Sequence, residues 1–441
     1  MKKTWKLARG ALLGVFLGGT ALACGDLLTV DDPQRYTSDD LDAALQAVAD
    51  GVLGDLHFTF DNLVMFNALA SDEMQHSGTW VQWDDMDHGR WAYDINSASN
   101  EGLLRARWFA RDAQDRIKRV YQEKNLGDPM KTKIMAQALA VEAWSDLLNA
   151  EWFCEAPAVS AGAAVTDKAL MAIAKTEMTE AMAAAQAAGS SATDLYNWAL
   201  AGRARANLWT GDYAGALADA KAVPEGFVNY ALYTTTTGGA WMVVVSTYGE
   251  NKAGSIREKW WPLLDQAAMK LKDPYTGQPD KRMPVRYTTG DKSVDGLTPF
   301  YSQWKYQDRN ADIPMTKKGE MDLIEAEVYW RQGDLANAMA KLNKLRTQAG
   351  LTPHSTSPMP TAAKVFEYFM HEQFAELFLE GRRMSYLDRL GQVGPVFKAM
   401  NDPLRPLPRP TKWPIASGEA RYNANIGEDL SKRCLPMSGT S

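Results

Sequence analysis

The sequence predicts an all-α protein, a scaffold of helical hairpins that one long, irregular, aromatic-rich insertion interrupts. Two stretches carry apolar residues at helical spacing on both sides of a Gly-Asp pair. Helical periodicity also covers most of the preceding chain, whereas residues 224–318 are rich in Thr, Gly and Pro and show no sustained helical stripe. We expect the insertion to carry function, because long irregular segments in compact helical proteins are usually functional.

Composition and charge exclude several classes of protein. The chain of 441 residues is 46% hydrophobic and 23% charged, which is ordinary for a globular protein with a sizeable core. Its formal net charge of −6 argues against a nucleic-acid binder, which needs a basic face for phosphates. No apolar run reaches the roughly 18 residues of a membrane span. The 15 Trp are unusually many, so their positions become the main question.

The first 23 residues are predicted to be a secretory signal peptide. A positively charged start precedes a short apolar core over residues 11–23, and the small Ala23 precedes Cys24. This end resembles a bacterial lipobox, in which the cysteine is diacylated and becomes the first residue of the mature protein. Ala21 stands where lipoboxes prefer Leu, so cleavage without lipidation remains the alternative. Acylation of Cys24 would anchor the protein to a membrane without spanning it.

Cys154 and Cys434 are the pair that remains once Cys24 is acylated. An exported protein matures in an oxidising compartment, which favours a disulfide between them. Such a bridge would join the middle of the chain to its tail and close a very long loop. Two buried free thiols are the alternative.

Residues 24–441 are predicted to form a single domain, with the helical scaffold over residues 36–223 and 319–390. Four helices are predicted over residues 41–56, 100–123, 130–152 and 167–188. A polar, aromatic stretch over residues 72–94 lies between the first two. After the insertion and the second hairpin, a last helix is predicted over residues 361–390, and an extended, Pro-rich segment over residues 391–441 follows.

The two hairpins, residues 195–223 and 321–350, share one register. Gly211 and Gly333 can adopt the left-handed conformation that ends a helix, and the Asp after each can cap the next helix. The apolar stripe of the second helix matches in order: Tyr213, Ala216, Leu217, Ala220 and Val223 against Leu335, Ala338, Met339, Leu342 and Leu345. Each hairpin resembles a tetratricopeptide repeat, a helical pair of about 34 residues that stacks because one unit cannot bury its apolar face alone.

Motifs at both ends resemble those of one family. Near the C-terminus the matching residues are Glu372, Glu376, Leu377, Glu380, Gly381, Arg383, Leu387 and Arg389, followed by Pro414, Ile415, Glu419 and Asn423. With Cys24 and the stretch over residues 28–33, they make the chain similar to the SusD/RagB family of outer-membrane surface lipoproteins. Tyr386, Ala416 and Ala424 depart from the family pattern. The resemblance implies a tetratricopeptide-like helical scaffold with an irregular ligand-binding region, seated as a lid on a TonB-dependent transporter.

Tryptophans outside the hairpins are the candidate ligand-binding residues. Partly exposed indoles stack on the apolar faces of sugars and other planar ligands, while polar neighbours supply hydrogen bonds. The candidates are Trp80, Trp83, Trp91, Trp241 and Trp304, with Asp84, Asp87 and Arg90 as polar partners. The alternative for each Trp is a place in the core.

Catalytic and metal sites are weakly indicated. Glu372, Glu376 and Glu380 recur at helical spacing, either as carboxylates for hydrolysis or as a structural network with nearby arginines, which the family resemblance favours. His371 begins half of a zinc-protease motif, but Ala375 stands where the second His is needed. We therefore predict no catalytic residue, no metal and no cofactor.

We predict a non-enzymatic, lipid-anchored outer-membrane protein that faces the cell exterior. It would bind a nutrient, a glycan or another oligomer, and deliver it to a SusC-like TonB-dependent transporter. The alternatives are a secreted helical glycoside hydrolase, which would turn over its substrate, and an envelope tetratricopeptide scaffold that binds protein partners. The identity of the ligand does not follow from the sequence.

Overall fold

The computed structural model describes residues 37–91, 97–236, 245–427, 429 and 433–438. The chain divides into two compact units, Met1–Ala44 and Leu45–Ser441. The described part of the first unit is α2, Ser38–Ala43, whose N-terminus Thr37 caps by accepting a hydrogen bond from the Asp40 N–H. The predicted signal peptide and Cys24 lie outside the described residues.

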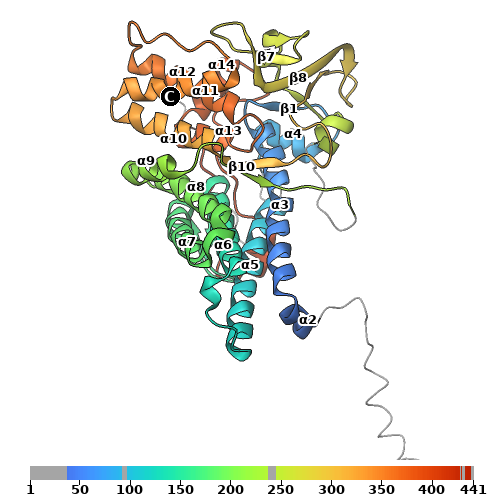
Figure 1. Ribbon diagram of the computed structural model, residues 1–441. Coiled ribbons are helices and arrows are strands. Elements are labelled where there is room, and N and C mark those ends of the chain that lie inside the picture. The colour runs from blue at the N-terminus through green and yellow to red at the C-terminus, as the bar shows by residue number, and fades with distance from the viewer. Residues whose placement is uncertain (1–36, 92–96, 237–244, 428, 430–432, 439–441) are drawn as a thin grey trace, which may run out of the picture. The chain divides into compact units, whose positions relative to one another are not determined.

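The second unit contains all the remaining described elements (Figure 1). Its helices are α3 Leu45–Ala70, α4 Val81–Asp87, α5 Ser97–Glu123, η1 Pro129–Lys131, α6 Lys133–Trp152, α7 Asp167–Ala188, η2 Gly189–Ala192, α8 Thr193–Trp209, α9 Tyr213–Ala222, η3 Val245–Glu250, η4 Glu258–Leu263, α10 Lys318–Arg331, α11 Leu335–Ala349, α12 Ala362–Glu376, α13 Arg383–Arg389, α14 Val393–Met400 and α15 Ser417–Tyr422. Its strands are β1 Met74–His76, β2 Glu155–Pro157, β3 Ala164–Thr166, β4 Val228–Ala231, β5 Gly254–Ile256, β6 Leu264–Asp265, β7 Lys270–Lys272, β8 Pro279–Lys292, β9 Pro299–Gln303 and β10 Ile313–Lys317. Of the helices in the described ranges, none combines the length and the apolar character that crossing a membrane requires.

The mainly helical fold class is confirmed, and both hairpins form as expected. α8 and α9 make the first hairpin, α10 and α11 make the second, and α9 lies against α10. Gly211 and Gly333 have φ values of 79° and 76°, in the left-handed region. The carboxylates of Asp212 and Asp334 accept hydrogen bonds of 2.9 Å and 3.1 Å from the backbone N–H three residues further on. The Gly-Asp turn therefore works as the sequence predicted.

α6 is the central helix of the N-terminal scaffold, and α3, α5, α7 and α8 pack around it. Its residues from Met135 to the last turn are all buried, as expected for a helix that is covered on every side. Trp144 of α6 stacks on Trp198 of α8, with ring centroids 5.5 Å apart. The single helix predicted over residues 41–56 falls on two helices, since α2 ends at Ala43 and α3 begins at Leu45. α3 also continues to Ala70, with buried residues on most of its circumference.

The single helix predicted over residues 361–390 is wrong. α12 ends at Glu376 and α13 begins at Arg383. Between them Leu379 and Gly381 have φ values of 54° and 69°, which an α-helix does not allow. Glu380 therefore leaves the helix face that carries Glu372 and Glu376.

The insertion contains strands that the sequence analysis did not assign. β6, β7, β8 and β9 form a four-stranded antiparallel sheet in that order. β5 pairs with β1 from the polar, aromatic stretch, with Met74 opposite Ile256, and β10 pairs with β4. In Figure 1, β7 and β8 lie at the opposite end of the second unit from α5, α6 and α7.

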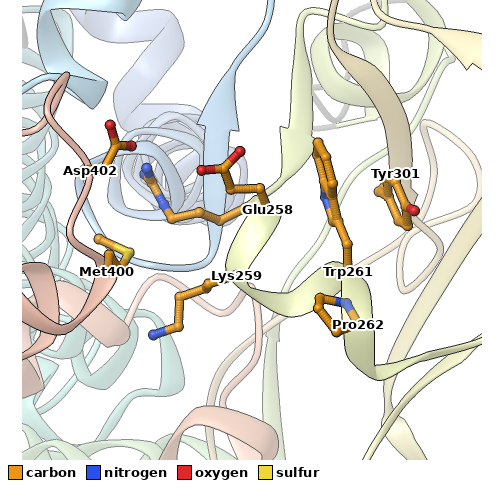
Figure 2. A pocket seen from close by; sticks show the side chains of 8 residues that line it. Glu258, Lys259, Trp261, Pro262, Tyr301, Met400 and Asp402 are labelled. Carbon is orange, nitrogen blue, oxygen red and sulfur yellow. The ribbon is translucent and has the colours of Figure 1, made fainter.

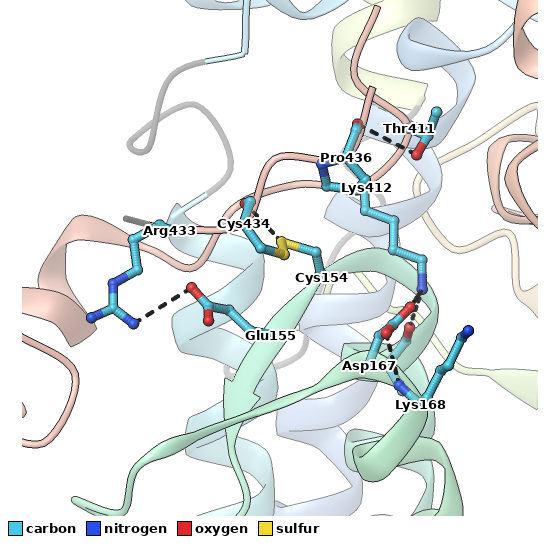
Figure 3. Close-up of a disulfide and its surroundings, with 10 residues drawn as sticks. Cys154, Glu155, Asp167, Lys168, Thr411, Lys412, Arg433, Cys434 and Pro436 are labelled. Atoms are coloured by element: carbon cyan, nitrogen blue, oxygen red, sulfur yellow. Dashed lines mark hydrogen bonds and ion pairs between the residues drawn. A yellow bond between two sulfur atoms is a disulfide. The ribbon is translucent and has the colours of Figure 1, made fainter. Parts of the chain in front are cut away.

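The C-terminal segment is tied to the end of α6 (Figure 3). Trp413 donates its backbone N–H to the Trp152 carbonyl at 2.9 Å, and its indole lies between those of Trp91 and Trp152, with both centroid distances 4.9 Å. Cys154 and Cys434 are joined as a disulfide with a Cα–Cα distance of 6.0 Å. The tail is thus part of the core.

Candidate functional site

The ladder between β8 and β9 presents different residues on its two faces. Tyr287 pairs directly with Tyr301, and Arg286 pairs with Ser302. Because successive side chains of a strand point to opposite faces, the two tyrosines share one face and Arg286 and Ser302 share the other. Trp304 directly follows β9 and lies two positions after Ser302, so it is on the same face as Ser302.

Tyr301 is the middle ring of an aromatic column. Its centroid lies 4.6 Å from that of Trp261 and 4.3 Å from that of Tyr287, with interplanar angles of 7° and 4°. Trp261 belongs to η4, and its Nε1–H donates to the Ile256 carbonyl at 2.7 Å, which fixes the indole. Both faces of Tyr301 are thereby covered, whereas Trp261 is stacked on one face.

The other face of Trp261 turns to a cavity of about 550 Å³. In Figure 2 the Trp261 ring lies between Tyr301 on one side and the polar side chains of Glu258 and Lys259 on the other. The cavity is lined by Arg257, Glu258, Lys259, Trp261, Pro262, Tyr301, Met400 and Asp402. A flat apolar face beside a few polar groups, in a volume of this order, suits a small organic ligand. We call this the Trp261 cavity.

Among the charged side chains of this lining, Lys259 and Asp402 are held in place, as is the buried Arg257, and Glu258 is free. The Lys259 ammonium donates to the Asp72 carboxylate at 2.8 Å and lies 4.4 Å from the centre of the Trp260 ring. The Asp402 carboxylate accepts from the Leu404 N–H at 2.9 Å. Glu258 is exposed, and its carboxylate has no hydrogen-bond or ion-pair partner within the described ranges. Lys259 is therefore preorganised, and Glu258 is available to solvent or ligand.

Trp304 lines two further hollows. One, of about 310 Å³, is also lined by Arg286, and the other, of about 530 Å³, by Lys281. The Arg286 guanidinium lies 4.9 Å from the centre of the Trp304 ring. The predicted candidate Trp304 is thus half-buried at a cavity wall, on the opposite face of the ladder from Tyr301.

Trp80 and Trp83 lie together but apart from the Trp261 cavity, whose lining contains neither residue. Their ring centroids are 4.3 Å apart, and Trp83 also packs edge-to-face on Phe66 and Tyr248. Trp80 is 42% exposed, and Trp83 is half-buried against the core. Trp80 remains a surface candidate, whereas Trp83 mainly supports it.

The polar partners predicted beside these tryptophans form ion pairs within the chain. Arg90, which follows α4, donates to Asp84 at 2.6 Å and to Asp85 at 2.7 Å, both within α4. These groups are partly exposed, so Asp84 and Arg90 remain accessible.

Asp87 and Trp91 are corrected, because both are buried. The Asp87 carboxylate accepts from Arg257 at 2.7 Å and also from Arg405, and no part of it reaches the surface. Trp91 stacks on Trp413. Neither residue can touch a ligand, so both leave the candidate set. Trp241 lies outside the described residues.

The three glutamates near the C-terminus form a structural network. Glu372 is fully buried and accepts from Arg346 and Arg282, both at 2.8 Å. Glu380 accepts from Lys305 at 2.6 Å and from Lys317 at 2.7 Å. These contacts support the structural interpretation over paired catalytic carboxylates.

One buried group has the composition of a metal site. The ligand atoms of Asp273, His371 and Glu372 lie within 4.8 Å of one another. The Arg346 guanidinium donates to both carboxylates, to Asp273 at 3.0 Å and to Glu372 at 2.8 Å. Because Arg346, and Arg282 at Glu372, already pair with these carboxylates, the residues do not fit a metal ion, and we assign none.

Comparison with known proteins agrees with this architecture. The model of the SusD family matches residues 241–425, a range that includes the aromatic column, α12 and α13. The structure of a SusD superfamily protein from Bacteroides vulgatus is similar with a TM-score of 0.66, over 87% of this chain and 97% of that chain, at 14% identity. The fold is SusD-like. The resemblance to the SusD/RagB family is thereby confirmed.

Other SusD-like structures are similar to this chain over most of its length. A SusD superfamily protein from Bacteroides thetaiotaomicron is similar with a TM-score of 0.64, over 92% of this chain and 100% of that chain, at 14% identity. A SusD-like carbohydrate binding protein from Bacteroides vulgatus has a TM-score of 0.58, over 80% of this chain and 84% of that chain, also at 14% identity. A search of the curated proteins finds no match.

Proposed function

We propose that this SusD-like protein is an outer-membrane surface lipoprotein, without enzymatic activity, that binds a glycan and delivers it to a SusC-like TonB-dependent transporter. The observation that carries the proposal is the unstacked face of Trp261 in the wall of a cavity with polar groups around it. A similar structure is that of a SusD-like carbohydrate binding protein, which supports the same class of ligand.

The aromatic column gives the proposed binding site its physical basis. The apolar face of a sugar ring packs on a flat indole, while the sugar hydroxyls hydrogen-bond to polar groups at the edge. Trp261 is fixed by its stacking on Tyr301 and by its Nε1–H bond. Little side-chain entropy is therefore lost when a ligand binds, and more of the contact energy appears as affinity.

The charged groups of the cavity favour binding over hydrolysis. A glycosidase needs two carboxyl groups that flank the scissile bond. Here the Asp402 carboxylate is paired with Arg405, which leaves Glu258 as the unpaired carboxylate of the lining within the described ranges. Incubation of purified mature protein with oligosaccharides should leave them intact by chromatography, and shortened products would favour the hydrolase alternative.

Substitution of Trp261 tests the ligand site. We expect Trp261→Ala to weaken glycan binding by about tenfold or more, the loss typical of a binding hot spot. The measurement is affinity electrophoresis through gels that contain each of a panel of neutral and acidic polysaccharides. Trp108→Ala is the matched control, because Trp108 is 49% exposed on α5 and lines none of the three hollows described above. Equal retardation of the Trp261 variant and the unmodified protein would contradict the proposal.

Anchoring and partnership are tested in membranes. Tagged protein extracted in mild detergent should co-purify with a large β-barrel transporter, identified by mass spectrometry. The Cys24→Ala variant should lose membrane attachment, because it cannot be acylated. Membrane-bound protein that repeatedly purifies without a barrel would contradict delivery to a transporter and favour the scaffold alternative.

A further inference from the structure

The Trp261 cavity lies against a buried group of residues that has more cations than anions. Arg257, which lines the cavity, and Arg405 both donate to the Asp87 carboxylate, and Arg409 donates to the Asp87 backbone carbonyl. Asp402 pairs with Arg405. We call these five residues the Asp87 cluster. It comes from four segments of the chain: α4, the start of η4, the end of α14 and the C-terminal segment.

The contacts in the Asp87 cluster leave one guanidinium without a carboxylate. Asp87 accepts from Arg257 at 2.7 Å and from Arg405 Nε at 2.8 Å. Arg409 donates instead to two backbone carbonyls, those of Ala70 at 3.1 Å and Asp87 at 3.3 Å, and lies 3.7 Å from the centre of the Phe397 ring. Three guanidinium groups therefore face two carboxylates.

The surplus charge persists at neutral pH. Burial, with the nearby Arg257 cation as a smaller cause, lowers the pKa of Arg409 to about 9, so this guanidinium is still protonated at pH 7. Nε and Nη1 of both Arg257 and Arg409 are buried without a hydrogen-bond acceptor among the described residues. Buried cations with unused donors create a positive potential that water screens poorly.

A second surplus of positive charge lies at Lys259. Asp72 is shared between Lys259 at 2.8 Å and Arg383 at 2.7 Å, so two cations meet one carboxylate. The adjacent Glu73 does not compensate, because burial raises its pKa to about 8 and keeps it mostly protonated at pH 7. The Lys259 ammonium donates to Asp72 and keeps further N–H donors.

We propose that the Trp261 cavity takes an acidic glycan, one that bears carboxylate or sulfate groups, with a sugar ring on Trp261 and an anionic group at Lys259. This inference rests on the proposed function and specifies its class of ligand. The positive potential is local, since the whole chain carries a formal net charge of −6. Lys259 is the direct contact, and the arginines of the Asp87 cluster act through their field.

Glu258 allows the sign of the effect to be tested. Its carboxylate is exposed at the cavity and opposes an anionic ligand. Glu258→Gln should therefore raise the affinity for an acidic glycan about two- to fivefold at low salt, the range of a single surface charge. Lys259→Gln should lower it about tenfold or more, since a hydrogen bond to a charged group is lost.

The probes are pairs of polysaccharides that share a backbone and differ in charge: polygalacturonate with its methyl ester, and dextran sulfate with dextran. The readout is the ratio of the acidic to the neutral affinity in affinity electrophoresis, at about 20 mM and 300 mM salt, where screening differs strongly. Lys133→Gln is the control for net charge, because Lys133 is exposed at the start of α6, outside the cavity lining. It should leave the ratio unchanged. Polygalacturonate and dextran sulfate separate carboxylate from sulfate as the anionic group.

The outcomes separate this inference from the proposed function. A ratio above one that rises in Glu258→Gln, falls in Lys259→Gln and shrinks at high salt supports the acidic glycan. If the protein binds the neutral polysaccharides as tightly as the acidic ones, and Trp261→Ala still abolishes binding, the inference is overturned while the proposed glycan binding stands. An acidic preference that neither Glu258→Gln nor Lys259→Gln changes also overturns it. No retention of any polysaccharide overturns the proposed function, and the inference with it.

Discussion

Trp261 and Trp413 carry the same side chain in opposite settings. Trp413 is stacked on both faces, between Trp91 and Trp152, and is fully buried. Trp261 is stacked on Tyr301 alone and turns its second face to a cavity. An indole covered on both faces contributes stability, and one with an open face can bind a ligand.

Glu73 should make the stability of the protein depend on pH. Burial raises its pKa from the ordinary 4.5 to about 8. Between these values the folded protein holds a proton that the unfolded chain has released, so the contribution of Glu73 to stability is full below pH 4.5 and is lost as the pH rises to about 8. In the Glu73→Gln variant the glutamine side chain does not ionise, and its amide oxygen can still accept the hydrogen bond from the Leu379 N–H.

The comparison is urea unfolding of both proteins at several values of pH between about 5 and 8. Relative to the glutamine variant, the unmodified protein should lose at most about 1.4 kcal/mol per pH unit over this window. Glu123→Gln is the control, because Glu123 is exposed at the end of α5. Parallel pH profiles for unmodified protein and Glu73→Gln would show that Glu73 is ionised in the fold.

Which tryptophans lie in the core could not be predicted from their positions in the sequence. Trp91 lies in the polar, aromatic stretch over residues 72–94, which makes it a candidate by sequence, yet it is covered by Trp413, more than 300 residues later. The polar Asp87 is likewise buried, because Arg257 and Arg405 arrive from distant segments to neutralise it. Conversely, Trp261 becomes a candidate only when the fold stacks it on Tyr301, which pairs with Tyr287 across the strands. Burial is set by long-range partners, which local patterns do not contain.

At the scale of elements, the break between α12 and α13 can be tested through a matched pair of glycines. Gly381 has φ 69°, and a Cβ there would lie 3.1 Å from Val64 Cγ2 and 3.3 Å from Val64 Cα on α3. Gly333 has φ 76°, and a Cβ there would meet nothing within 4 Å. Both Ala variants suffer backbone strain, but only Gly381→Ala also crowds a neighbouring helix.

We therefore expect Gly333→Ala to lower the free energy of unfolding by about 1 kcal/mol and Gly381→Ala by about 2–3 kcal/mol. Chemical denaturation monitored by circular dichroism measures both. Equal losses in the two variants would mean that the contact with Val64 contributes nothing.

Helices were easier to predict than strands, for a physical reason. The helix over residues 167–188 is found with both of its predicted ends, because Thr166 caps its start and Gly189 follows its end. In β8 the alternation of buried apolar and polar residues is limited to Met283 and Val285, with Pro284 between them, and β9 has no such alternation, so the strand pattern is too short to be predictive. The last helix was overextended because its apolar spacing continues through Leu377 and Leu379, where the backbone has already turned.

At the scale of the whole molecule, the bond between Cys154 and Cys434 should be covalent and stabilising. The two residues are 280 positions apart, and the chain-entropy model assigns a large effect to a loop of that length. We expect Cys154→Ser, Cys434→Ser and the double variant each to lose about 2–5 kcal/mol of unfolding free energy. Because the same bond is lost each time, the three losses should be equal and not additive.

Alkylation followed by intact-mass measurement checks the bond directly. In a Cys24→Ala background, unreduced protein should take up no label after denaturation, and reduced protein should take up two. Two labels without reductant would show that the thiols are free.

The ladder between β8 and β9 also has a consequence for how the two hollows beside it can evolve. Tyr301 lines the Trp261 cavity, whereas Phe300, Ser302 and Trp304, together with Gln303, line the hollow of about 310 Å³. Substitutions at Phe300 or Ser302 can thus remodel that hollow while the Trp261 cavity keeps Tyr301. Insertion of a single residue in β9 would exchange the two sets of side chains, whereas insertion of two would preserve them. The strand therefore lets two surfaces diversify separately within five residues of sequence.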